Sequence, residues 1–147
     1  MFQHILIATD GSELAGKALA QGLSLARALG AQITVVTVTE PWVTEVTGEA
    51  AFGLPFAEYD KAMTASAARI LSKASDAANK EGLPCATIHV KERHPAEGIL
   101  DTAKARTCDL IVMASHGRRG LTRLLLGSQA QNVVTHSGIS VLNMICR

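Results

Sequence analysis

The residues best suited to chemistry lie in one stretch near the C-terminal end, residues 113–128 (MASHGRRGLTRLLLGS). Gly117 and Gly127 allow a backbone to turn or to approach a ligand closely. Ser128 follows Gly127 at the predicted start of a helix, where unpaired N–H groups and the helix dipole attract anions. Three nearby arginines add positive charge: Arg118, Arg119 and Arg123. The stretch predicts a phosphate-binding loop, and its alternative is a surface loop with solvated arginines and a serine cap.

Other patterns of catalytic chemistry are absent from the sequence. It lacks the complete Gly-x-x-x-x-Gly-Lys-Ser/Thr phosphate loop and the Gly-x-Gly-x-x-Gly of dinucleotide folds. No serine stands in a Gly-x-Ser-x-Gly setting, so triad chemistry is not indicated. The five histidines and three cysteines show no spacing typical of metal ligands. We therefore predict neither a catalytic residue nor a metal site built from side chains.

The composition excludes several classes of partner. The 147 residues carry 14 Lys and Arg against 13 Asp and Glu, so a basic site must be local and a nucleic-acid surface is not expected. All aromatic residues precede position 60, which leaves the C-terminal half without a ring for base stacking. No stretch approaches the ~20 apolar residues of a membrane helix. We expect one cytoplasmic domain over residues 1–147, with no nucleic-acid or membrane partner.

Short apolar runs alternate with helical patterns along the chain. Strands are predicted over residues 3–9, 32–39, 85–91, 110–114 and 140–145. Helices are predicted over residues 13–29, from 59 to a stop at 82, over 95–107 and over 128–136. Within the last helix, Ala130, Val133 and Val134 should face inward. Residues 40–55 form a long connection with little regular structure.

This alternation predicts a doubly wound α/β fold, a parallel sheet with helices on both faces, because right-handed crossovers leave few other arrangements. Ligands of such sheets sit beyond the carboxyl ends of the strands, where the strand order reverses. Three segments meet that description: Thr9–Ser12, Val38–Trp42 and Met113–Ser128.

The spacing of the glycines resembles the motif of the universal stress protein family. Its nucleotide-binding members carry Gly, two residues, Gly, nine residues, then Gly with Ser or Thr. Gly117, nine further residues and Gly127-Ser128 reproduce the second and third parts. Residues 5–12 (ILIATDGS), 95–99 (PAEGI) and 109–113 (DLIVM) also look like the family, so the likeness extends over essentially the whole chain. It implies a five-stranded sheet ordered 3-2-1-4-5, Rossmann-like and similar to adenine nucleotide alpha hydrolases.

The resemblance further implies ATP in the cleft beyond strands one and four. Asp10 and the backbone near Val38 would face adenine and ribose, and Met113 would line the adenosine pocket. The start of the last helix would donate hydrogen bonds to the phosphates, and Mg²⁺ or Mn²⁺ would neutralise the phosphate charge. The expected binding residues are Thr9, Asp10, Val38, Met113, Ala114, His116, Gly117, Arg118, Gly127, Ser128 and Gln129. For Asp10, a role as a turn or cap residue of the first helix is an alternative.

Ala114 departs from the family motif, which has glycine at this position. If the position requires a positive φ, alanine costs about 1–2 kcal/mol and weakens binding roughly tenfold or somewhat more. If it requires only a close approach in an extended conformation, one methyl group is tolerated. The sequence leaves both alternatives open.

The leading hypothesis is an ATP-binding sensor or regulatory module of the universal stress class, in which nucleotide orders the loop over residues 118–126. One alternative is slow ATP hydrolysis, for which Asp10 and His116 are the candidate bases. Another is a dimeric interaction protein without nucleotide. The family commonly pairs its last strands, which implies a homodimer through residues Ser140 to Ile145. Trp42, Phe52 and Phe56 either cover the pocket as a lid or pack under a helix or at a subunit contact.

Overall fold

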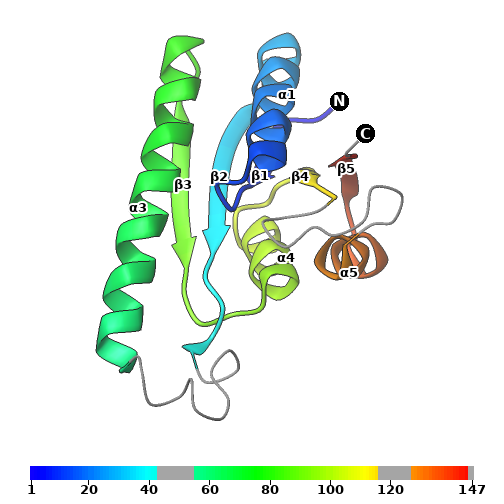
Figure 1. Cartoon of the computed structure of the whole chain (residues 1–147). Coiled ribbons are helices and arrows are strands. Elements are labelled where there is room, and N and C mark those ends of the chain that lie inside the picture. The colour runs from blue at the N-terminus through cyan, green and yellow to red at the C-terminus, as the bar shows by residue number, and fades with distance from the viewer. Residues whose placement is uncertain (43–54, 116–126, 146–147) are drawn as a thin grey trace.

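The protein is described from a computed structural model over residues 1–42, 55–115 and 127–145. Its strands are β1 (His4–Ala8), β2 (Gln32–Val38), β3 (Cys85–Val90), β4 (Leu110–Ala114) and β5 (Ser140–Met144). Its helices in these ranges are α1 (Glu13–Leu29), α3 (Phe56–Lys80), α4 (Pro95–Ala105) and α5 (Ser128–His136). The strands form one parallel sheet ordered β3-β2-β1-β4-β5, which confirms the predicted fold and strand order (Figure 1).

Two apolar cores lie on the two faces of this sheet. Alternate strand residues such as Ile5 and Ile7 pack with α1 and α3, while Leu6 and Ile111 pack with α4 and α5. The central strands are buried on both sides, as their continuous apolar runs predict. The carboxyl ends of β1, β2 and β4 therefore meet at one edge of a rigid layer. No helix in the described ranges is long and apolar enough to span a bilayer.

The helix ends follow the local signals of the sequence. Ser12 is the N-cap of α1, and its hydroxyl accepts the N–H of Ala15 at 3.2 Å. Gly30 ends the helix with φ 66°, the left-handed conformation that glycine adopts without strain. The longest helix, α3, begins at Phe56, three residues earlier than predicted. These caps fix where each helix starts relative to the strand ends.

Val134 of α5 is a correction to the predicted core. Ala130 and Val133 are buried, but Val134 is 45% exposed. Helix α5 packs between α4 and the edge strand β5, so it buries only a narrow stripe of its surface. A residue at the border of that stripe stays in water, which the helical periodicity alone does not reveal.

Candidate functional site

A cavity of about 680 Å³ lies at the carboxyl ends of β1, β2 and β4. Its volume falls within the range of roughly 300–1,000 Å³ that is typical of ligand pockets. It is lined by every predicted binding residue in the described ranges: Thr9, Asp10, Val38, Met113, Ala114, Gly127, Ser128 and Gln129. The predicted residues His116, Gly117 and Arg118 lie outside the described residues. Residues far apart in the sequence thus contribute to one site.

The turn after β1 places Asp10 at the rim of this cavity. Thr9 donates its N–H to the carbonyl oxygen of Val36 at 3.0 Å, which extends the sheet by one bond. Asp10 Oδ1 then accepts the N–H of Ser12 at 2.9 Å. This contact holds the turn that begins α1. The turn alternative for Asp10 is therefore confirmed, and Asp10 also lines the cavity.

The end of β2 is held from two sides. On one side, Thr39 donates its N–H to the carbonyl oxygen of Val90 at 2.9 Å, and its hydroxyl lies 3.1 Å from Nε2 of His89. On the other side, α4 approaches closely at Gly98, where an added Cβ would lie only 2.7 Å from Cγ2 of Val38. The glycine is needed for this approach. Val38 is therefore fixed between the sheet and α4.

The start of α5 forms the opposite end of the cavity. Gly127 donates its N–H to the carbonyl oxygen of Ser115 at 2.8 Å. Ser115 in turn donates its backbone N–H to the carbonyl oxygen of Met144 in β5, also at 2.8 Å. Gly127 is the N-cap of α5, and as a glycine it has no side chain to cap the helix. The first intrahelical bond runs from the N–H of Gln131 to Gly127. Within the described residues, the N–H groups of Ser128 and Gln129 have no acceptor, so they are available to an anion.

Ala114 is in the conformation that tolerates a side chain. It is the last residue of β4 and pairs with Met144 of β5. Of the described non-glycine residues, only Glu92 and Thr107 have a positive φ. The backbone at Ala114 is therefore extended, which is the conformation of the second alternative, and Ala114 forms part of the cavity wall.

Helix α3 supplies a wall that the sequence did not assign to the site. Tyr59, Met63, Ser66 and Ile70 line the cavity, and the Tyr59 hydroxyl donates to the carbonyl oxygen of Glu40 at 2.7 Å. Most of this stripe is visible in the sequence as helical periodicity, but periodicity does not distinguish a pocket wall from a core face.

Where the structure describes them, the aromatic residues considered as a lid do not line the cavity. Trp42 and Phe56 pack edge to face with ring centres 6.1 Å apart, and neither lines the cavity. Phe52 lies outside the described residues. The pair instead joins the end of the segment after β2 to the first residue of α3.

Charge is distributed unevenly around the cavity. The charged side chains among its described lining residues are Asp10 and Glu40, both from the β1 and β2 ends. The N-termini of α4 and α5 also face it, through Pro95 and Ser128. Because helix N-termini carry partial positive charge, the α5 side suits an anion and the β1–β2 side suits hydroxyl or amine donors. In the described part of the chain, no three His, Cys, Asp or Glu side chains cluster as metal ligands.

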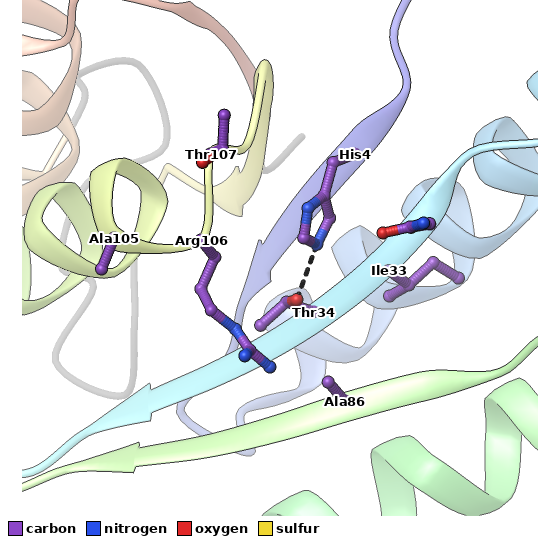
Figure 2. A pocket seen from close by; sticks show the side chains of 8 residues that line it. His4, Ile33, Thr34, Ala86, Ala105, Arg106 and Thr107 are labelled. Carbon is purple, nitrogen blue, oxygen red and sulfur yellow. Dashed lines mark hydrogen bonds between the residues drawn. The ribbon is translucent and has the colours of Figure 1, made fainter.

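A second hollow of about 370 Å³ lies at the other end of the sheet (Figure 2). It is lined by His4, Thr34 and Arg106, and Nε2 of His4 lies 2.7 Å from the Thr34 hydroxyl oxygen. None of the predicted binding residues lines it. Helix α4 ends here, and its terminal carbonyl groups oppose an anion. The predicted binding residues that the structure describes therefore line the cavity at the carboxyl edge and not this hollow.

Comparison with known proteins identifies the family of this chain. The family model of the Universal stress protein family matches residues 1–143. The chain belongs to the universal stress protein family. A relative from this family, the universal stress protein in the QAH/OAS sulfhydrylase 3′ region of Thermus aquaticus, is 36% identical over 142 residues. That alignment covers 97% of this chain and 98% of the relative.

Solved structures share the fold over the same length. Hypothetical protein MJ0577, whose biochemical function was assigned from its structure, is 27% identical with a TM-score of 0.82, covering 100% of this chain and 97% of that protein. A universal stress protein in complex with cAMP is 23% identical with a TM-score of 0.73, covering 99% of this chain and 98% of that protein. The family and the α/β fold are thus established for this chain.

Proposed function

We propose that this universal stress protein binds ATP in the cavity at the carboxyl edge and acts as a regulatory module. One observation carries the proposal: every predicted nucleotide-binding residue in the described ranges lines the same cavity, although these residues come from three strand ends and one helix start. The cAMP complex, which has this fold, adds that the fold accepts an adenine nucleotide.

The geometry favours one orientation of the nucleotide. The adenosine end would lie against Val38 and Met113, with the Asp10 carboxylate available to accept hydrogen bonds from ribose hydroxyl groups. The phosphates would lie at the start of α5, where the N–H groups of Ser128 and Gln129 are available. A Mg²⁺ or Mn²⁺ ion would bind together with the phosphates and neutralise their charge.

The proposed role is binding, with hydrolysis as a slow side reaction at most. A nucleotide held between the strand ends and α5 contacts elements from both faces of the sheet. To act as a signal it must bind one arrangement of these elements more tightly than another. We place the protein in the cytoplasm, which fits the free thiols of Cys85 and Cys108, the cysteines that the structure describes. We further propose that residues 1–147 act as a single domain.

Isothermal titration with Mg-ATP tests the proposal, together with mass spectrometry of small molecules released from freshly purified protein. We expect saturable heat in the micromolar to millimolar range and an adenine nucleotide in the released fraction. The variant Gly127→Val should abolish the heat, because the side chain fills the approach to α5 while φ −64° and ψ 157° remain allowed for valine. Gly138→Val is the matched control, since a Cβ there meets no atom within 4 Å. Absence of heat and of any co-purified nucleotide would overturn the proposal.

We also propose a homodimer through β5. This strand lies at one edge of the sheet, and Leu142 and Ile145 beside it are 43% and 58% exposed. The Asn143 Oδ1 atom is buried and has no hydrogen-bond partner among the described residues. An exposed edge with apolar side chains favours pairing with another strand. Sedimentation at several concentrations should show a dimer for the wild type and a monomer for Leu142→Lys. A wild-type protein that is monomeric at every concentration would contradict the proposed dimer.

A further inference from the structure

Gln129 makes an unusual contact between two helix starts. Its Oε1 atom accepts the N–H of Ala96 at 3.0 Å, although the two residues belong to α5 and α4. Ala96 is the second residue of α4, and the N-cap residue His94 makes no side-chain capping bond. Gln129 therefore supplies from another helix the acceptor that an N-cap side chain usually provides.

This contact fixes the orientation of the Gln129 carboxamide. A backbone N–H only donates, so the oxygen of the amide group must face Ala96 and the NH₂ group must point away from it. No described residue accepts a hydrogen bond from that NH₂ group. In the described ranges, Asn143 Oδ1 is the buried side-chain N or O atom that lacks a hydrogen-bond partner. The Nε2 atom of Gln129 also lacks a partner there but is not among such buried atoms, so it is accessible to solvent.

Gln129 belongs to the anion-favouring end of the cavity. Gln129 lines the cavity beside Ser128 and Ala130, and Pro95 of α4 lines it from the neighbouring helix. Oriented donors at such a place add to the backbone N–H groups of α5. A carboxamide held by a second bond also loses little side-chain freedom when it binds a ligand.

We infer that Gln129 determines specificity for the phosphate end of the ligand, with its NH₂ group donating to phosphate oxygens and Ala96 holding it in place. This inference rests on the proposed nucleotide site. Because a hydrogen bond to a charged group is stronger than a neutral one, loss of the donor should weaken ATP binding by about tenfold to a hundredfold. Adenosine, which has no phosphate, should bind with an unchanged constant.

The variant Gln129→Glu separates this role from a structural one. The carboxylate still accepts the N–H of Ala96 and stands at two helix N-termini, so thermal stability should be equal or higher. The donor is lost, and a negative charge replaces it. Gln131→Glu is the matched control, because it adds the same charge to the same helix at an exposed residue outside the cavity. Gln129→Met, of similar length, removes the donor without adding charge.

The experiment is isothermal titration of these variants with Mg-ATP, adenosine and tripolyphosphate. We expect the affinity for ATP and for tripolyphosphate to fall at least tenfold in both Gln129 variants. In Gln131→Glu both affinities should change less than threefold. If the wild type binds ATP, and Gln129→Glu binds ATP with the same affinity as Gln131→Glu, the inference fails and the proposed function stands. If the wild type binds tripolyphosphate but not ATP, and Gln129→Glu loses it, the inference holds and the nucleotide function fails. Binding of neither ligand to the wild type defeats both.

Discussion

Gly98 should not tolerate alanine, although it lies inside a helix. A Cβ at this position would lie 2.7 Å from Cγ2, 2.9 Å from Cγ1 and 3.4 Å from Cβ of Val38. Rotation of the Val38 side chain cannot move both methyl groups away, because one always remains near the face that α4 occupies. The strand end or the helix must shift instead.

The magnitude follows from two opposing contributions. Overpacking by one methyl group costs about 1–3 kcal/mol. Replacing glycine by alanine within a helix returns about 0.5–1 kcal/mol. We therefore expect Gly98→Ala to lose about 1 kcal/mol of unfolding free energy, within a range of about 0–2.5 kcal/mol. Gly16→Ala in α1 is the matched control, because a Cβ there meets no atom within 4 Å. That control should gain about 0.5–1 kcal/mol.

Urea denaturation measures both changes, and a double-mutant cycle with Val38→Ala identifies the cause. Removing the two methyl groups of Val38 makes room for the new Cβ, so the double variant should be more stable than the sum of the single effects by about 1 kcal/mol or more. Because Val38 lines the cavity, Gly98→Ala should also weaken ATP binding. A Gly98→Ala protein as stable as Gly16→Ala, or additive behaviour in the cycle, would refute the reasoning.

Three further predictions concern single side chains elsewhere in the fold. Tyr59→Phe removes the hydroxyl bonded to the Glu40 carbonyl and should cost about 0.5–1.5 kcal/mol in urea denaturation; an unchanged midpoint would contradict this bond. Burial, with a smaller effect of Lys91 and opposed by Asp60, lowers the pKa of His89 below 6.5. The unfolded chain therefore takes up this proton first, and stability should fall as the pH drops from 6.5 through the folded pKa. Between pH 7.5 and 5.5, the unfolding free energy should change less with pH in His89→Gln than in the wild type. An equal change in both proteins would exclude His89 as the source of the pH dependence. Burial also raises the pKa of Cys108 to about 11, so iodoacetamide at pH 8 should leave this thiol unmodified in folded protein, whereas rapid alkylation before unfolding would show that it is accessible.

Much of the site could be predicted because its signals are local. Turn residues after each apolar run mark the strand ends, and Gly127-Ser128 marks a helix start, so their convergence follows from the rule for parallel sheets. The wall formed by Tyr59 and Met63 could not be predicted in the same way, since a helical stripe looks identical whether it faces a core or a cavity.

Contacts between distant elements are the other part that the sequence does not reveal. The bond from Ala96 to Gln129 joins residues 33 positions apart, and no spacing rule connects them. The close approach of Gly98 to Val38 is likewise a contact between residues that are far apart in the sequence. The conformation of Ala114 also depends on its pairing with β5, which the sequence motif does not specify.

The most direct test of the proposed nucleotide site is an amide NMR titration of the uniformly labelled protein with Mg-ATP. The account predicts saturable shifts for the amides of Gly127, Ser128 and Gln129 at the start of α5 and for Val38 at the end of β2. Amides of His4 and Thr107, which line the hollow at the other end of the sheet, should stay in place. Saturable shifts confined to that hollow, or no shifts at millimolar ATP, would contradict the account.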